Sequence, residues 1–224
     1  MNRSTIIIGL LPILLFGACS TDQPHQQGEG DRQKAVQPAR FNPRNADTAT
    51  FAGGCFWCVE AGFEQIKGVY EAVSGYAGGE MPSPTYRQVA SGQTRHAETV
   101  QVYFDPKTID YQTLLDVFFT VHDPTQLNRQ GPDVGKQYRS AIFYHNDRQK
   151  RLAKDKIKRL ETSGQFEKPI VTRLNAFDQF YKAEKKHQDY EEKHPNDPYI
   201  RSVSRPKIDR VKEQFKERLK EKHQ

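Results

Sequence analysis

The 224-residue sequence contains only three cysteines, and this scarcity limits the sites it can build. Cys55 and Cys58 form a single Cys-x-x-Cys pair, and the third cysteine, Cys19, lies in an apolar leader. Such a pair supplies two of the four ligands that a structural zinc ion needs, and the sequence holds no second pair. The sequence therefore argues against a structural zinc site.

Most of the chain also lacks an excess of positive charge. The net charge is +6, but residues 201–224 contain nine Lys and Arg against four Asp and Glu, which accounts for +5 of it. The rest of the chain is close to neutral and has no basic patch interleaved with aromatic residues. We therefore expect no nucleic-acid partner.

The apolar run near the N-terminus, residues 6–16, is too short for a transmembrane helix, which needs about 20 apolar residues. This run follows Arg3 and is followed by Gly17, Ala18 and Cys19. This arrangement is typical of a secretory signal, and residues 14–19 resemble a bacterial lipoprotein signal in which Cys19 is lipidated. Ordinary cleavage near Ala18 is the alternative; we favour lipidation because it explains a cysteine directly after Gly-Ala. We therefore expect a protein exported to the bacterial envelope and anchored to a membrane through Cys19.

Four segments follow from composition and pattern. Residues 1–18 form the signal peptide, and residues 19–46 are a tether with too little apolar surface to offset chain entropy. Residues 47–200 are long enough for one domain with a sizeable core. In residues 201–224, one apolar stripe predicts a basic amphipathic helix that lies on the body. The stripe consists of Ile208, Val211, Phe215 and Leu219.

The domain is organised around residues 53–60. A β-prone segment, residues 49–52, precedes Gly53 and Gly54, and an amphipathic helical pattern follows them. The glycines would let the backbone turn sharply and bring a substrate close to the main chain. Cys55 then lies at the start of a helix, where unpaired N–H groups and the helix dipole favour a thiolate, and Cys58 shares its face. An inert small apolar residue is the alternative, but the pair, the glycines and the helix start together favour sulfur chemistry.

The remaining pattern mixes strands with helices and predicts a two-layer α/β sandwich. Apolar residues alternate with polar ones from Glu98 to Phe104, so we expect a strand with one buried side. Asp147 is the expected cap of a charged helix that runs to Ser163. Other strands are expected at 69–79, 138–144 and 169–174, other helices at 86–90, 111–121 and 180–192, and a loop at 125–137.

Seven short stretches occur in order between about Thr50 and His194. They are Gly54-Cys55-Phe56-Trp57-Cys58-Val59-Glu60, Gly75-Tyr76-Ala77-Gly78-Gly79, Tyr86-Arg87-Gln88-Val89, His96-Ala97-Glu98, Phe104-Asp105-Pro106, His122-Asp123-Pro124-Thr125 and Gln137-Tyr138-Arg139-Ser140-Ala141-Ile142. Together these stretches resemble the peptide methionine sulfoxide reductases of the A type. This resemblance implies a two-layer α/β sandwich with a ferredoxin-like core and a mixed sheet. It further implies reduction of the S epimer of methionine sulfoxide, free or in proteins, recycling by a thioredoxin-type reductant, and neither a metal nor an organic cofactor.

The resemblance also assigns roles to residues. It makes Cys55 the nucleophile that attacks the sulfoxide sulfur and Glu98 the acid that protonates the sulfoxide oxygen. The remaining assignments are Tyr86 and Tyr138 as hydrogen-bond donors to that oxygen, Phe56 and Trp57 as the apolar cage for the substrate methyl group, and Asp133 as an acidic residue near the bound substrate. The chain departs from the family pattern at Arg95, where glycine is usual, at Cys58, which is often glycine, and in having no C-terminal cysteine. Cys58 is thereby the only candidate for the resolving thiol in the body.

Elementary chemistry supports these roles. A sulfoxide oxygen leaves poorly until it gains a proton, and burial beside aromatic rings would raise the pKa of Glu98 toward neutrality. Tyrosine hydroxyls can hydrogen-bond developing charge on oxygen, and an aromatic cage selects a methyl thioether by shape. Taken singly, Glu98 would be read as an exposed strand-end charge and Phe56 as core.

Two other classes of function compete with this one. A thiol–disulfide oxidoreductase could use Cys55-Phe56-Trp57-Cys58 as a thioredoxin-like motif, but the Glu98 and Tyr138 motifs would then have no role. A non-enzymatic surface lipoprotein is the third possibility.

Overall fold

The computed structural model describes residues 46–221 of the chain. The predictions for the signal peptide, Cys19 and nearly all of the tether fall outside these residues. The strands are β1 (Asp47–Gly53), β2 (Val69–Ala77), β3 (Ala97–Phe104), β4 (Arg129–Gln130), β5 (Asp133–Val134), β6 (Ser140–Tyr144), β7 (Arg173–Ala176) and β8 (Phe180–Lys182). The α-helices are α1 (Phe56–Glu64), α2 (Tyr86–Ala90), α3 (Tyr111–Val121), α4 (Asp147–Thr162), α5 (Tyr190–Lys193) and α6 (Arg205–Gln214). Shorter helical turns are η1 (Lys136–Tyr138), η2 (Lys185–His187), the π-helix η3 (Ile200–Ser204) and η4 (Lys216–Arg218).

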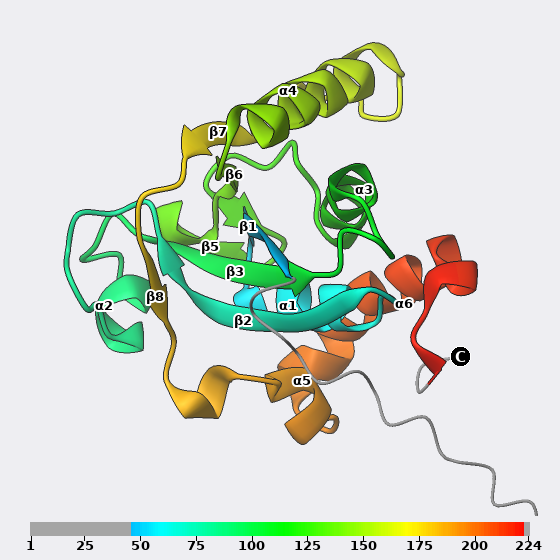
Figure 1. The fold of residues 1–224 in the computed structure, drawn as a ribbon. Helices are drawn as coiled ribbons and strands as arrows, with labels where there is room; N and C mark the ends of the chain where they lie inside the picture. The colour runs from blue at the N-terminus through cyan, green and yellow to red at the C-terminus, as the bar shows by residue number, and fades with distance from the viewer. Residues whose placement is uncertain (1–45, 222–224) are drawn as a thin grey trace, which may run out of the picture. The chain divides into compact units, whose positions relative to one another are not determined.

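A six-stranded sheet carries the fold, in the order β7-β6-β1-β3-β2-β8 (Figure 1). All neighbours are antiparallel except β6 and β7, so the sheet is mixed. The succession β1-α1-β2-β3-α3-β6 with the strand order β6-β1-β3-β2 is the ferredoxin-like arrangement, with β7 and β8 added at the edges. The predicted α/β sandwich is therefore confirmed.

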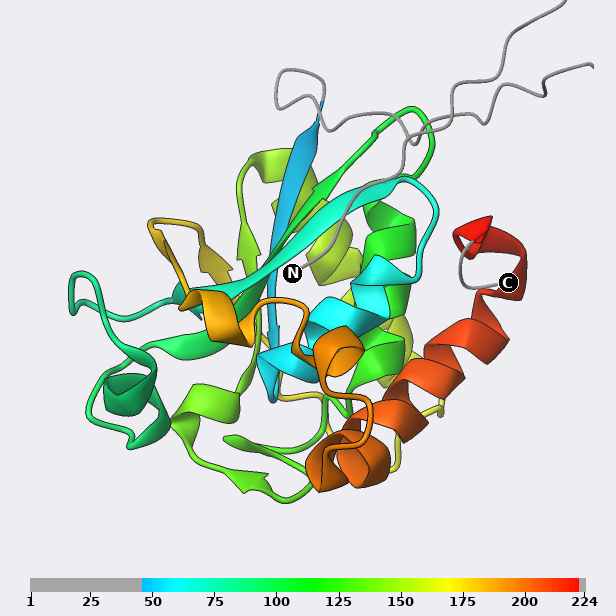
Figure 2. The ribbon, with the colours of Figure 1, turned by 90° about the horizontal axis from the view of Figure 1, so that it is seen from below.

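Three helices, α1, α3 and α6, gather on one side of the sheet (Figure 2). The core beneath them is centred on Phe51 of β1, whose ring stacks on those of Phe63, Phe118 and Tyr111 at centroid distances of 5.2, 4.9 and 6.1 Å. Stacked rings bury large apolar area and hold helices at fixed distances from the sheet. Through Phe63, near the end of α1, this packing holds the helix that begins at the cysteines against the sheet.

The opposite face of the sheet is also covered, which corrects the expectation of a strand with one buried side. Alanines of four central strands, Ala52, Ala77, Ala97 and Ala141, form a second cluster with Phe143. Phe177, in the segment that links β7 to β8, and Phe180 of β8 pack onto it. Thr99 and Gln101 of β3 are buried as a result.

The edges of the sheet differ most from the sequence prediction. Residues 180–192 were predicted as a helix, but Phe180–Lys182 pair with β2 as strand β8, and Asp189 adopts a left-handed backbone, φ 55°. Tertiary hydrogen bonds override helical periodicity here: Ala183 N–H donates to the Ser74 carbonyl, and the Gln188 amide pairs with both backbone groups of Ser74.

Three smaller predictions are also corrected. The strand expected at 169–174 begins at Arg173, because the Val171 N–H donates to the Pro124 carbonyl instead of joining the sheet. Asn146, not Asp147, caps α4, since its side chain accepts the Gln149 N–H. The loop expected at 125–137 contains the β4–β5 hairpin and most of η1.

The C-terminal segment packs on the same core as the rest of the domain. Its helix is shorter than predicted: α6 spans Arg205–Gln214 and follows the π-helix η3. The predicted stripe of Ile208, Val211, Phe215 and Leu219 is buried. Leu219 pairs in a β-bridge with Ile66, two residues after α1, so the end of the segment is held against the body. Within residues 46–221, no helix combines the length and apolar character needed to cross a membrane.

A glycine substitution tests how closely α1 approaches α3. Alanine normally stabilises a helix interior relative to glycine by about 1 kcal/mol. A Cβ at Gly62, however, would lie 2.8 Å from Val121 Cγ2. We expect Gly62→Ala to lower the free energy of unfolding by about 1–3 kcal/mol, the usual cost of overpacking, measured by urea denaturation. Part of this loss should disappear in a Val121→Ala background. A net stabilisation by Gly62→Ala would contradict the packing described.

Candidate functional site

The chain enters the site through a tight turn between β1 and α1. Gly54 has a φ of 96°, which favours glycine, and a Cβ there would lie 2.5 Å from Gln130. The space beside Gly53 is filled by Phe118 and His122. The glycines therefore provide the turn, as predicted, but protein side chains, not a substrate, occupy the space next to them. Cys55 is the N-cap of α1 and is 6 % exposed.

Glu98 lies at the start of β3 and joins that strand to the first turn of α1. Its Oε2 accepts the Phe56 N–H at 3.0 Å, and the side chain is buried. Burial raises the pKa of Glu98 to about 8, helped by the negative charges of Asp133 and Cys58 and opposed by the hydrogen bond from Phe56. The predicted rise in this pKa is confirmed. The carboxyl is therefore mainly protonated at neutral pH. It can donate a proton close to Cys55, because it is hydrogen-bonded to the next residue, Phe56.

The two cysteines are free thiols that share a hydrogen bond. Burial raises the pKa of Cys55 well above its usual value, and the bond to Cys58 raises it further. The same bond lowers the pKa of Cys58 to about 6. The expectation of a Cys55 thiolate is therefore wrong for the resting site. These directions place the shared proton on Cys55 and favour the thiolate form of Cys58.

The C-terminal segment surrounds the Cys58 sulfur. Ser204 Oγ lies 3.0 Å from Cys58 Sγ, and Lys207 Nζ lies 3.8 Å from it. Both residues are buried, Lys207 at 8 % exposure. A hydroxyl donor and an ammonium group both favour a thiolate, and both contribute to the low pKa of Cys58.

Aromatic rings gather around the first turn of α1, which carries the thiol pair. Phe56 is buried, while Trp57 is partly exposed and stacks on Tyr190 with ring centroids 3.8 Å apart. Tyr199 meets the Trp57 ring edge-on at 5.9 Å. His187 contacts the rings of both Tyr86 and Phe56, with centroids 4.2 and 5.5 Å apart, and those two rings are stacked at 6.2 Å. These rings form an aromatic cluster next to Cys55, around the first turn of α1.

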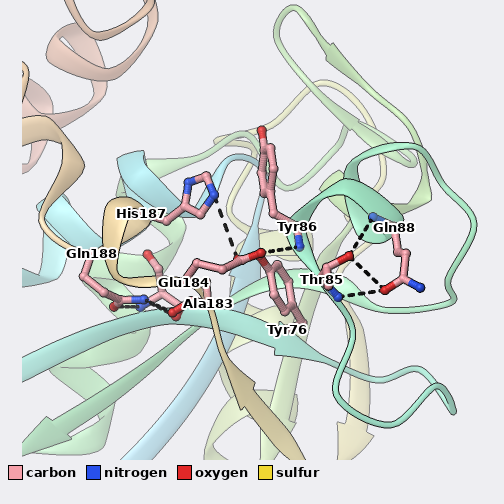
Figure 3. Close-up of polar contacts among 9 residues, drawn as sticks. Tyr76, Thr85, Tyr86, Gln88, Ala183, Glu184, His187 and Gln188 are labelled. Atoms are coloured by element: carbon pink, nitrogen blue, oxygen red, sulfur yellow. Dashed lines mark hydrogen bonds and ion pairs between the residues drawn. The ribbon is translucent and has the colours of Figure 1, made fainter.

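Glu184 holds Tyr86 in place (Figure 3). Its carboxylate accepts the Tyr86 N–H and the Tyr76 hydroxyl, both at 2.9 Å, and His187 Nε2 lies 4.0 Å away. Thr85 caps α2 through a hydrogen bond with Gln88. Figure 3 shows the Tyr86 ring extending from this anchored backbone beside His187. Burial and the nearby charges of Glu98 and Cys55 raise the pKa of Tyr86 to about 12, so the hydroxyl remains a donor.

Asp133, Tyr138 and Tyr199 complete the site from its other side. The Tyr199 hydroxyl donates to Asp133 Oδ2 at 2.6 Å and is also hydrogen-bonded to Cys55. Burial raises the pKa of Tyr138 and of Tyr199, with added effects of Glu98 on Tyr138 and of Cys55 on Tyr199. Arg95, by contrast, has an exposed side chain that pairs with Glu80 at 3.1 Å.

The structure thus brings together the eight body residues that the sequence singled out, and adds several that it missed. Glu184, His187 and Tyr190 lie within residues 180–192, which the sequence predicted as a helix. Tyr199 follows that segment and lies one residue before the predicted end of the domain. Ser204 and Lys207 reach Cys58 across 146 and 149 residues of sequence. No local pattern marks such contacts. Among residues 46–221, no three His, Cys, Asp or Glu side chains are grouped as a metal ion would require.

Comparisons with known proteins agree with this geometry. Residues 47–219 match the family model described as "Peptide methionine sulfoxide reductase". The chain is 55 % identical over 172 residues to a peptide methionine sulfoxide reductase MsrA of Natronomonas pharaonis, covering 77 % of this chain and 97 % of the relative. A relative of the same name from Thermus thermophilus is 51 % identical over 174 residues, covering 78 % and 98 %.

Two solved structures have the same fold. Reduced Mxr1 of Saccharomyces cerevisiae superposes with a TM-score of 0.62 at 38 % identity, covering 70 % of this chain and 90 % of that chain. Methionine sulfoxide reductase A of Corynebacterium diphtheriae gives 0.61 at 34 % identity, covering 70 % and 78 %.

Proposed function

The chain belongs to the peptide methionine sulfoxide reductase family, and from this premise we propose how its residues carry out the reaction. The enzyme is an oxidoreductase that reduces methionine sulfoxide to methionine by thiol chemistry. One observation supports the assignment of roles most directly. The buried Glu98 carboxyl, with a pKa of about 8, is hydrogen-bonded to the residue that follows Cys55. A proton donor and a sulfur nucleophile are thereby fixed side by side.

In the first step, Cys55 attacks the sulfoxide sulfur. Its proton moves to the hydrogen-bonded Cys58 thiolate, and Glu98 protonates the sulfoxide oxygen, which Tyr86 and Tyr138 hold by their hydroxyls. The oxygen passes to Cys55, so methionine leaves and Cys55 becomes a sulfenic acid. The substrate sulfur is reduced and the cysteine sulfur is oxidised by the same two electrons.

Substrate selection follows from the aromatic cage. Phe56 and Trp57 enclose the methyl group next to the sulfoxide sulfur, and Asp133 lies near the bound substrate. A cage on one side and oxygen donors on the other fix the order of groups around the chiral sulfur. That the S epimer is the one consumed, free or in oxidised proteins, rests on membership of the family.

In the second step, Cys58 attacks the sulfenic sulfur. A disulfide forms between Cys55 and Cys58, and the oxygen leaves as water with the protons of the sulfenic acid and of Cys58. A thioredoxin-type dithiol then reduces the disulfide and is itself oxidised. Glu98 recovers its proton as Cys58 returns to the thiolate.

The competing function, thiol–disulfide exchange through Cys55 and Cys58, is not favoured. It would leave the buried Glu98 and the hydroxyls of Tyr86 and Tyr138 without a task. The family comparisons point to sulfoxide reduction instead.

The location of the enzyme is a separate proposal. The apolar leader and Cys19 support export and anchoring of the N-terminus in a membrane of the bacterial envelope through a lipidated cysteine. Residues 19–46 would then serve as a tether. The anchor places repair of oxidised proteins outside the cytoplasm.

The reaction and its nucleophile can be tested together. With racemic acetylated methionine sulfoxide and dithiothreitol, we expect the S epimer alone to be converted, and Cys55→Ser to abolish conversion. Chiral chromatography of the remaining substrate gives the answer. Equal consumption of both epimers, or refolding of scrambled disulfides in place of sulfoxide reduction, would refute the proposal.

The role of Glu98 predicts a pH profile. Proton donation requires the protonated carboxyl, so single-turnover methionine formation should fall about tenfold per pH unit above pH 8. Glu98→Gln should slow it on the order of 10²–10⁴-fold and remove this decline. Glu80→Gln, an exposed carboxyl change, is the control. An unchanged rate in Glu98→Gln would exclude Glu98 from the mechanism.

The role of Cys58 predicts a stalled enzyme. Cys58→Ser should release about one methionine per enzyme in a burst and then remain a sulfenic acid, because no second thiol is present to condense with it. Dimedone trapping and mass spectrometry would detect the adduct on Cys55. Dithiothreitol can partly restore turnover, but thioredoxin should not. Undiminished turnover with thioredoxin would show that Cys58 does not resolve the intermediate.

The lipid anchor predicts a modified N-terminus. Mass spectrometry of the mature protein from its bacterial host should show an acylated Cys19 as the first residue. Cys19→Ser should release the protein from the membrane fraction, while Ala18→Ser is a matched neighbouring change. A mature chain that begins elsewhere would disprove lipidation without affecting the enzyme.

A further inference from the structure

We propose that Lys207 and Ser204, in the C-terminal segment, hold Cys58 as an anion and so set the rate at which it resolves the oxidised Cys55. The inference rests on the proposed role of Cys58 as the resolving thiol. It makes the C-terminal segment part of the reaction machinery, although that segment contains no thiol of its own.

The geometry around Cys58 is that of an anion site. The Ser204 hydroxyl lies 3.0 Å from the sulfur and can donate to it, and the Lys207 ammonium group lies 3.8 Å from the sulfur. Among residues 46–221, no carboxylate lies within ion-pairing distance of Lys207. A buried ammonium group needs a negative partner, and the Cys58 thiolate is the partner that the structure provides.

The local backbone explains how these groups reach Cys58. Pro206 has no N–H, so the α-helical bond from residue 206 to the Ser202 carbonyl cannot form. The chain instead makes a π-helical turn, in which the Arg205 N–H donates to the Ile200 carbonyl. Single π-turns are frequent at functional sites. Here the turn ends at Ser204, one helical turn before Lys207.

The charges near Cys58 make this support necessary. Asp133 faces the sulfur and raises its pKa, and Glu98 would do the same when ionised. The Cys55 thiol also donates a hydrogen bond to Cys58, but this S–H donor is lost once Cys55 is oxidised. At that moment the positive charge of Lys207 and the hydroxyl of Ser204 remain to favour the thiolate. The thiolate is the form that attacks the sulfenic sulfur.

The step itself is balanced. Cys58 gives up the proton that it received from Cys55, and its thiolate forms a bond to Cys55 Sγ. The S–O bond of the sulfenic acid breaks, and the departing hydroxide takes that proton to become water. Cys58 is oxidised and the sulfenic sulfur is reduced, with no external oxidant. Lys207 transfers no atom; it lowers the energy of the attacking anion.

Lys207→Met keeps most of the side-chain length and removes the charge, so it tests this role directly. In single-turnover mixing with methionine sulfoxide, the wild-type and variant proteins should both release about one methionine per enzyme. Disulfide formation by the variant should be slowed at least threefold at pH 7, with more Cys55 sulfenic acid trapped by dimedone. At pH 10 the rates should converge or reverse, because a thiol of higher pKa is the better nucleophile once ionised.

Three further variants separate charge from packing. Lys207→Arg should restore the rate at pH 7, Ser204→Ala should share part of the defect, and Lys216→Met, an exposed change in the same segment, should have no effect. An equal slowing of Lys207→Met at pH 7 and pH 10 would indicate structural damage and overturn the proposal. So would a wild-type rate at pH 7. If Cys58→Ser itself turned over normally with thioredoxin, the failure would lie in the proposed resolving role and not in Lys207.

Discussion

The hydrogen bond from the Phe56 N–H to the Glu98 carboxyl is the constraint on which the rest of the site depends. The first N–H groups of a helix lack intrahelical partners, and here one of them is satisfied by a carboxyl from the sheet. The bond links Cys55, the N-cap of α1, to the first residues of β3. Because the partner is backbone, no substitution at position 56 removes the donor except proline.

The hydrogen bond from Phe56 and the burial of the side chain have opposite effects on the pKa of Glu98, and the effect of burial is the larger. A backbone donor stabilises the ionised carboxylate and lowers the pKa of Glu98, yet the net pKa is about 8. The carboxyl is buried among aromatic residues and lies close to other acidic groups. These surroundings destabilise the ionised form by more than the single hydrogen bond stabilises it. The same interaction can thus position Glu98 without abolishing its ability to donate a proton.

The sequence predicted the centre of the fold well and its periphery poorly, for physical reasons. β1, α1, β2, β3 and α3 bury strong periodic patterns, so local signals and tertiary packing agree there. At residues 180–192 the sequence has a helical pattern, but residues 180–182 pair with β2 instead. No local signal predicts this pairing. The eight body residues assigned from motifs converge in the structure. Ser204 and Lys207 were placed outside the catalytic domain, because a basic amphipathic pattern describes which face of a helix is buried but not which buried group it meets.

Proton counting connects the two cysteines with Glu98. At neutral pH the reduced site holds a proton on Glu98, a proton on Cys55 and a negative charge on Cys58, next to Lys207. The charge on Cys58 is one of the causes that raise the pKa of Glu98. When Cys58 enters the disulfide this charge disappears, and with it the smallest of the three causes that raise the pKa of Glu98, after burial and Asp133. The acid is therefore protonated most firmly when the thiols are reduced and a substrate can react. Oxidation of the thiols removes the charge on Cys58 and so lowers the pKa of Glu98. The redox state of the cysteine pair is thereby coupled to the protonation of the acid that the next turnover requires.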